Sequence, residues 1–438
     1  MTPMPRSTVA EAFKANNMKV ISRLLRPITL LFLLASVILA PQFARGEWQA
    51  HQIRQGDGKG GWVTRAALRQ VLKHPDSEFT MPFSLVQMGN GEIAILVSRE
   101  KAKPGGGRIV QPNIAFSKDD GASWPEFHAI ANTKGRPVFL TWLGGKRLSF
   151  ATQTWEDAKE QRVFSDDYGR SWHKAVELQR TTSQHTYAVE GNNWVDRNKK
   201  GQAQAIFEIG WHLKAGRSFP AGPYTSVFRR SADDGHTWGD EVSPVEWQFT
   251  REHAGKRWVR GTSEGSLVRA ANGDLVAALR TDAPPRYFEE VHDDSLEGTA
   301  ISISKDDGKT WSRLHHLFEV GRHHANLQRL PNGHLVCTVI VRQDIQAGKR
   351  TKAEGQLTSL RRGCDAVISK DNGRTWNLTA RYELDGFDFL REDGYYLDCK
   401  VGHVSALALA DGNMLCVYGD YRQGAVLIKW KPGGNVKR

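Results

Sequence analysis

The feature that most constrains the fold is an eight-residue pattern, Ser-x-Asp-x-Gly-x-Thr/Ser-Trp, which occurs five times. The copies begin at Ser117, Ser165, Ser231, Ser304 and Ser369. An Asp followed two residues later by Gly favours a tight turn, because the carboxylate can accept hydrogen bonds from nearby backbone N–H groups. The Trp that ends each copy can pack into the sheet beside the turn. Five copies in one chain indicate a repeat architecture in which each copy closes one sheet.

A second pattern, an apolar strand, a glycine turn and another apolar strand, precedes each copy and occurs once more near the C-terminus. The six pairs lie at 83–99, 138–153, 187–210, 266–280, 325–342 and 404–419, and the third is the poorest match. Six pairs, each extended by two outer strands, predict six four-stranded sheets. We expect the outer strand at 425–432 to pair with an early strand at 47–54, which would close the ring and cover its edges.

The composition agrees with this pattern. The chain has 438 residues, of which 39% are hydrophobic and 25% are charged, so a disordered or fibrous protein is not expected. Its 42 glycines suit tight turns and disfavour a helical bundle, and its 14 tryptophans suit aromatic packing. The expected fold class is therefore all-β.

The N-terminal segment has the features of a secretory signal. An apolar run at 28–40 follows three basic residues and precedes small residues at a possible cleavage site, 44–46. The sequence predicts a signal peptide over 1–46, or from an alternative start at Met18, followed by one domain at 47–438. We expect a secreted or periplasmic protein with no membrane anchor after cleavage.

Charge and cysteine content limit the partners. Without residues 1–46 the chain has 54 basic and 47 acidic residues, a net charge of +7. This excess favours an anionic ligand, but no long basic run predicts nucleic-acid binding. No P-loop or dinucleotide fingerprint occurs, so no cofactor is expected. No CxxC pair occurs among Cys337, Cys364, Cys399 and Cys416, so no metal is expected, and buried thiols are favoured over a disulfide.

The five copies resemble the Asp-box, or BNR repeat, of the sialidase (neuraminidase) superfamily, and the resemblance covers nearly all of 47–438. It implies a six-bladed β-propeller with five Asp-box repeats. It also implies a secreted glycosidase of the exo-α-sialidase type, with an altered residue set, that acts on a terminal acidic sugar of a glycan. We expect a monomer whose partner is a glycan or polysaccharide.

The order of the strands predicts which face carries the chemistry. If each repeated turn joins the third strand of a sheet to the fourth, then the starts of the first strands and the ends of the second strands share the opposite face. The aspartates of the repeated turns are therefore interpreted as structural. The long segments at 281–299 and 343–362 follow second strands and are expected to overhang the functional face.

The resemblance implies a site with three arginines on a carboxylate, a Tyr nucleophile assisted by Glu, and an Asp acid/base. The best match is Glu264 with Arg280, for which an ordinary cross-strand ion pair is the alternative. Elsewhere the sequence departs from the family. Thr80 stands where the first arginine is expected, the loop at 99–113 contains no Asp, and His403 stands in the place of the Tyr.

Other residues on this face could replace the missing ones. His324 and His403 are the preferred pair, because a neutral imidazole can act as a base near pH 7. Arg99, Arg280 and Arg342 end second strands in three sheets, but strict alternation would not direct all of them inward without a bulge. The candidate catalytic residues are Glu264, His403, His324 and Asp293, and the candidate substrate-binding residues are Arg280, Arg342, Arg99, Arg322 and Tyr287.

Two further hypotheses keep the same fold. In one, the protein is a lyase that acts on uronates, with His403 or Tyr396 removing the C5 proton of the sugar. In the other, the protein binds glycans without catalysis. The mass of the product distinguishes hydrolysis from elimination, and binding without turnover would identify the third case.

Overall fold

The computed structural model describes residues 46–436, apart from 105–107, 132, 134, 155–158, 179–185, 214–223, 286–295, 345–348, 351–356, 359–360 and 390–400. These residues form strands and two short 3-10 helices, η1 (Val245–Trp247) and η3 (Leu378–Ala380), which confirms the all-β class. Within these ranges no helix is long and apolar enough to cross a membrane. The predicted signal segment lies outside them, apart from Gly46.

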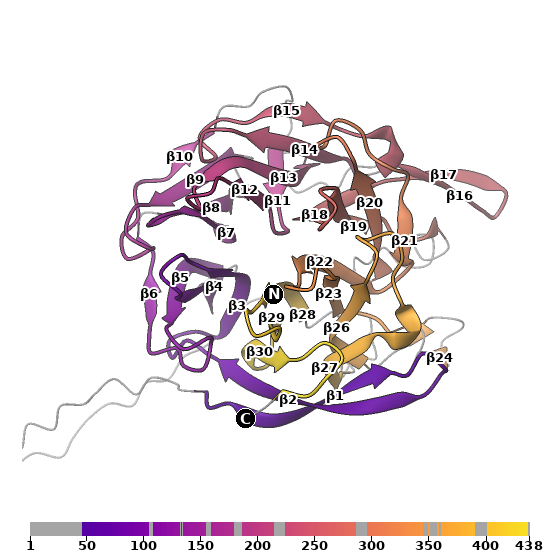
Figure 1. Ribbon diagram of the computed structural model, residues 1–438, viewed down its shortest axis with the longest axis horizontal. Helices are drawn as coiled ribbons and strands as arrows, with labels where there is room; N and C mark the ends of the chain where they lie inside the picture. Colours follow the sequence, from indigo (N-terminus) through magenta and orange to yellow (C-terminus); the bar gives the residue numbers. More distant parts are fainter. Residues whose placement is uncertain are drawn as a thin grey trace, which may run out of the picture. The chain divides into compact units, whose positions relative to one another are not determined.

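Four antiparallel sheets stand alone (Figure 1). The first contains β3 (Phe79–Gln87), β4 (Ile93–Ala102), β5 (Arg108–Ser117) and β6 (Phe127–Ala129). The second contains β7 (Arg136–Gly144), β8 (Arg147–Thr154), β9 (Lys159–Ser165) and β10 (Val176–Glu177). The third contains β11 (Thr186–Val189), β12 (Trp194–Arg197), β13 (Ala203–Leu213), β14 (Ser226–Ser231) and β15 (Gly239–Val242). The fourth contains β18 (Thr262–Arg269), β19 (Leu275–Thr281), β20 (Gly298–Ser304) and β21 (His315–Phe318).

Most of the remaining strands form one nine-stranded sheet in the order β22-β23-β26-β27-β1-β2-β30-β29-β28. One half has β22 (Arg322–Arg329), β23 (Leu335–Val341), β26 (Arg361–Ser369) and β27 (Tyr382–Asp388). The other half has β2 (Trp62–Leu72), β30 (Gly424–Trp430), β29 (Met414–Asp420) and β28 (Val401–Ala408), and β1 (Gln49–Gly56) joins the two. Two small hairpins, β16 (Phe249–His253) with β17 (Lys256–Arg260) and β24 (Lys349–Arg350) with β25 (Leu357–Thr358), complete the described strands.

This topology corrects two expectations. The prediction of six separate sheets is wrong: four sheets are separate, and β1 fuses the last two groups of strands by pairing with both β27 and β2. The strand that pairs with β30 is β2 and not the predicted strand at 47–54. The physical reason lies in burial. β1 has one buried apolar side chain, Ile53, and suits an outer position, whereas β2 places Ala67 and Leu72 in the cores beside β30.

The sheets follow one another around a common centre, a propeller-like arrangement (Figure 1). Inner strands of neighbouring sheets contact each other, as β28 does with β3, β3 with β7, β18 with β22 and β22 with β28. Apolar clusters fill the spaces between neighbouring sheets. Cys337, Cys364 and Cys416 are buried free thiols, as predicted, and Cys399 lies outside the described residues.

The five repeated segments form the same turn, which joins the third strand of a sheet to the fourth. In the fourth sheet, Asp306 accepts hydrogen bonds from the hydroxyl of Ser304 at 2.8 Å and from the backbone N–H of Thr310 at 2.9 Å. The hydroxyl and the N–H of Thr310 lower the pKa of Asp306. The indole of Trp311 donates to the carbonyl of Gly308 at 3.0 Å. Corresponding Asp contacts occur in the other four turns.

Candidate functional site

The inner strands of five strand groups each contain a β-bulge near their start. A bulge leaves one residue unpaired and turns its side chain away from the regular alternation. The residues left unpaired at these bulges include Phe83, Phe139, Glu264, His324 and His403. In the third sheet the inner strand is instead interrupted between β11 and β12, and Glu190 lies at that interruption.

Several of these side chains meet at the centre of the sheets. The rings of Phe83 and His403 are 4.5 Å apart, and those of His403 and His324 are 4.8 Å apart. His324 Nδ1 lies 2.7 Å from Glu264 Oε2. The carboxyl groups of Glu264 and Glu190 are close enough to shift each other's pKa. We call Glu190, Glu264, Arg280, His324 and His403 the central cluster.

Glu264 is the most heavily paired member of the cluster. Arg280 donates to Glu264 Oε1 and also to Glu297, so its guanidinium lies between two carboxylates. Burial alone would raise the pKa of Glu264, but the charge of Arg280 and the contact with His324 hold it well below its ordinary value. Glu264 is therefore ionised at neutral pH.

Glu190 has the opposite behaviour. Burial, the negative charge of Glu264 and their shared hydrogen bond raise the pKa of Glu190 well above its ordinary value. Two carboxyl groups in contact cannot both ionise readily, so one retains its proton. Glu190 holds the proton and remains partly exposed, whereas Glu264 is almost fully buried. The pair therefore combines an accessible acid with a buried carboxylate.

The histidines of the site are neutral. Burial is the main reason why the pKa of His403 lies well below its ordinary value, and the neighbouring His324 and Arg136 lower it further. The pKa of His324 is lowered by burial although Glu264 opposes this effect. His403 is partly exposed, so it lies nearer to solvent than His324 does.

The structure brings together five of the residues selected from the sequence: Glu264, Arg280, His324, His403 and Arg342. Arg342 joins them through His324 Nε2 at 3.0 Å. Arg322 lies in a different group, where it contacts Asp365 at 2.9 Å and Asp344 at 3.0 Å.

Arg99 also lies apart from the central cluster. It lies next to His74. Burial is the main cause that lowers the pKa of His74, and the charge of Arg99 lowers this pKa further. Asp293 and Tyr287 lie outside the described residues, as does Tyr396.

No family model matches the sequence, and a search of curated proteins found no match. Solved structures do match. A protein of unknown function from Dyadobacter fermentans is 18% identical with a TM-score of 0.57, covering 82% of this chain and 97% of that one. A Hadza microbial sialidase is 13% identical with a TM-score of 0.51, covering 86% and 70%. An α-L-arabinanase from Penicillium chrysogenum, complexed with arabinobiose, is 13% identical with a TM-score of 0.50, covering 87% and 98%.

This chain has the sialidase-like β-propeller fold. The resemblance to the sialidase superfamily is thus confirmed at the level of the fold. At these identities the comparison shows the fold and not the chemistry of the site.

Sequence reasoning missed several residues of the propeller centre. Glu190 lies in the strand pair that matched the pattern worst, and that poor match was the available signal, because the strand is interrupted where Glu190 faces Glu264. Arg136 begins β7, and its charge lowers the pKa values of both Glu190 and His403. Asp282 follows β19 and accepts a 2.6 Å hydrogen bond from the backbone N–H of Gly261, and burial raises its pKa to about 6.

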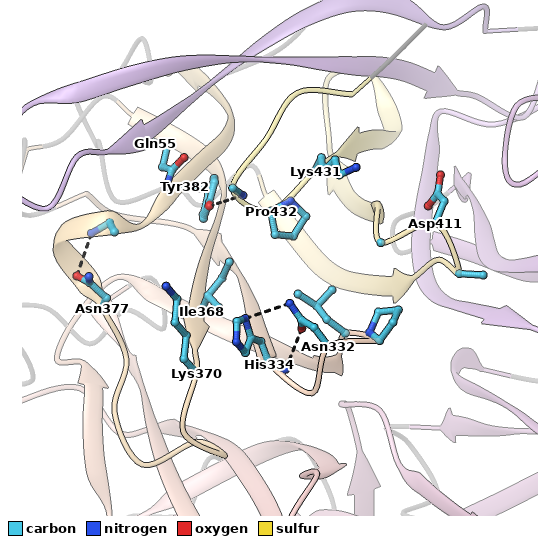
Figure 2. Close-up of a pocket in the computed structure, with 16 residues that line it drawn as sticks. Gln55, Asn332, His334, Ile368, Lys370, Asn377, Tyr382, Asp411, Lys431 and Pro432 are labelled. Carbon is cyan, nitrogen blue, oxygen red and sulfur yellow. Dashed lines mark hydrogen bonds between the residues drawn. The ribbon is translucent and has the colours of Figure 1, made fainter.

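Two cavities of the propeller are lined by residues outside the central cluster. One, of about 570 Å³, is lined by residues of inner strands beyond the bulges, including Asn193 and Gln328. The other, of about 540 Å³, lies between the glycine turns at 331–334 and 410–412, with Lys370 and Lys431 at its wall (Figure 2). Neither cavity is lined by Glu190 or Glu264.

Proposed function

We propose that this protein is a glycoside hydrolase that uses Glu190 and Glu264 to cleave a terminal sugar from a glycan. The observation that supports this most directly is the carboxyl pair with opposite pKa directions, since hydrolysis of a glycosidic bond requires one carboxylic acid and one carboxylate. The fold agrees, because propellers of this type include proteins named as a sialidase, an arabinanase and an arabinofuranosidase.

The two roles follow from the charge states. Glu190 is protonated and partly exposed, so it is suited to donate a proton to the leaving oxygen. Glu264 is ionised, so it is suited to attack the anomeric carbon. Inverting enzymes need about 6.5–9.5 Å between their carboxyl groups to hold a water molecule. Retaining enzymes hold their carboxyl groups about 5–5.5 Å apart. Glu190 and Glu264 are close enough to interact directly, so we propose a retaining mechanism in which a bound sugar separates them and Glu264 is the nucleophile.

The charge of the sugar is a finer proposal. Arg280, which the sequence predicted to bind substrate, is already bound to Glu264 and Glu297. Arg136 is partly exposed beside Glu190 and His403, and its guanidinium lies 5.8 Å from the ring centre of Phe83. We therefore assign contact with an anionic group of the sugar to Arg136, in a residue set that differs from the one the resemblance implied.

The test is a screen of sialylated, uronate-containing, sulfated and arabinose-containing glycans, with products identified by mass spectrometry. Hydrolysis adds the mass of water, whereas elimination leaves an unsaturated sugar that absorbs in the ultraviolet. Turnover should be lost in Glu264→Gln and retained in Glu126→Gln, an exposed carboxylate outside the cluster. An unsaturated product would favour the lyase hypothesis, and retained binding without turnover would favour a glycan-binding propeller.

A further inference from the structure

Arg342, His324 and Glu264 form a continuous chain of polar contacts that the proposed chemistry leaves unexplained. Arg342 Nη2 lies 3.0 Å from His324 Nε2, and His324 Nδ1 lies 2.7 Å from Glu264 Oε2. All three residues are buried. A guanidinium can only donate hydrogen bonds, so Nε2 of His324 must accept one. The proton of the neutral ring is then on Nδ1, the nitrogen that faces Glu264.

The backbone is shaped to make this contact. His324 has a φ of 50° at the bulge of β22, a left-handed conformation that is uncommon for residues other than glycine. Successive side chains of a regular strand point to opposite faces, yet the rings of His323 and His324 are only 4.9 Å apart. Backbone strain of this kind is concentrated at functional sites.

A metal ion is the competing explanation for this group. Glu264, His323 and His324 offer three ligand atoms that all lie within 4.8 Å of one another. However, an Nδ1 atom that carries a proton cannot coordinate an ion. The charges of Arg280 and Arg342 also act on His323, and they would oppose a cation at this position. These observations favour a proton between His324 and Glu264.

We propose that His324 is a positioning residue, whose tautomer is fixed by Arg342 and whose Nδ1–H orients Glu264 for attack. This inference rests on the proposed function. The contact between Nδ1 and Oε2 is short but poorly aligned as a hydrogen bond. Such contacts often align only when substrate binds. Here a sugar that separates Glu190 from Glu264 would leave Glu264 held by Arg280 and His324 alone.

The tautomer can be measured without a substrate. In the full chain labelled with ¹⁵N-histidine, NMR should show one ring protonated on Nδ1 at neutral pH, and its signals should disappear in His324→Gln. Arg342→Gln should reduce the preference for this tautomer. A proton on Nε2 of His324 in the wild type would overturn the proposal. Stoichiometric Zn²⁺ uptake that changes the His324 signals would overturn it as well.

Activity provides a second test once a substrate is known. In His324→Gly, kcat should fall about a hundredfold, the size of effect expected when a reacting group is misplaced by about 1 Å. Added imidazole should restore part of the activity, and the acid limb of the pH profile should move to higher pH. His334→Gly, which alters the wall of the cavity in Figure 2, is the control and should show no imidazole effect.

Negative results in the two tests would have different meanings. If no glycan is hydrolysed by the wild type, the proposed function fails, and the NMR result still decides whether Arg342 fixes the tautomer of His324. If the wild type is active but His324→Gly has an unchanged acid limb and no response to imidazole, the positioning role is wrong. Circular dichroism of each variant establishes that it is folded.

Discussion

The carboxyl pair of Glu190 and Glu264 combines a partly exposed acid with a more deeply buried carboxylate. Its asymmetry comes from neighbours: Arg280 and His324 act on Glu264, while Glu190 faces Glu264 itself. Two glutamates thus acquire different proton affinities because their neighbours differ. This is the level at which the proposed chemistry can be tested most directly.

Glu190→Gln should lower kcat by about 10² to 10⁴-fold for substrates with a poor leaving group, because a general acid contributes that much. A substrate with an activated leaving group needs less protonation and should lose much less. Steady-state kinetics with matched leaving groups measures the difference. An equal loss with both substrates would contradict the role of Glu190 as the acid.

The activity of the wild type should depend on pH through the same pair. Activity requires ionised Glu264, whose pKa is lowered, and protonated Glu190, whose pKa is raised. The pH range of full activity should therefore extend to lower and to higher pH than it would for two unperturbed carboxyl groups. A pH profile of kcat/KM checks this, and a narrow optimum near the ordinary pKa of Glu would contradict it.

Ionisation of Asp282 should lower the free energy of unfolding as the pH rises. Burial raises its pKa from 3.8 to about 6, so the folded state keeps the proton over a range in which the unfolded chain releases it. The stabilising effect is complete below pH 3.8 and is lost by about pH 6. Relative to Asp282→Asn, the wild type should lose up to about 3 kcal/mol across this range. Urea unfolding at pH 4 and pH 7 measures the difference in stability between the wild type and Asp282→Asn. An equal difference at both pH values would disprove the prediction.

The sequence allowed part of this site to be predicted. Glu264 and Arg280 were found because one begins an inner strand and the other ends the strand beside it, which places them at one mouth of the channel. Glu190 and Arg136 were missed for a physical reason. Their positions depend on an interrupted strand and on a bulge, and neither irregularity follows from alternation of apolar and polar residues.

Among the structural elements, the repeated turn was the most predictable, because its hydrogen bonds are local and involve residues only a few positions apart. The bulges were less predictable, since each depends on contacts with strands of other sheets. The same contrast explains why the strand that closes the ring was predicted wrongly. Whether β1 or β2 pairs with β30 depends on how each fits against distant strands, and both contain polar residues among apolar ones.

Trp311→Ala should destabilise the propeller by about 3–5 kcal/mol, the usual loss for a buried Trp. The indole packs against Phe228 at 5.4 Å and Trp247 at 5.0 Å between ring centres, so it joins two sheets as well as closing its own turn. Trp62→Ala is the control, because Trp62 is 40% exposed. Urea unfolding of both variants measures the losses, and similar values would show that the turn does not depend on its Trp.

For the whole molecule, the expected export of the chain gives a prediction about processing. The apolar run and the small residues at 44–46 imply cleavage just before Glu47. N-terminal sequencing or intact mass of protein from the exported fraction of the native host should show a start near Glu47. Recovery of an exported chain with residues 1–46 intact would contradict this.

The hairpin of β1 and β2 has a consequence for the kinetics of folding. Leu68 of β2 pairs with Lys429, so the ring can close only when segments from opposite ends of the described chain meet. Contacts between such distant segments slow folding because a long loop must first be closed. Moving residues 46–72 to follow Val436, whose N–H already donates to the carbonyl of Ala66, would make this pairing local. Such a circular permutant should refold faster while the unfolding rate of the ring changes little.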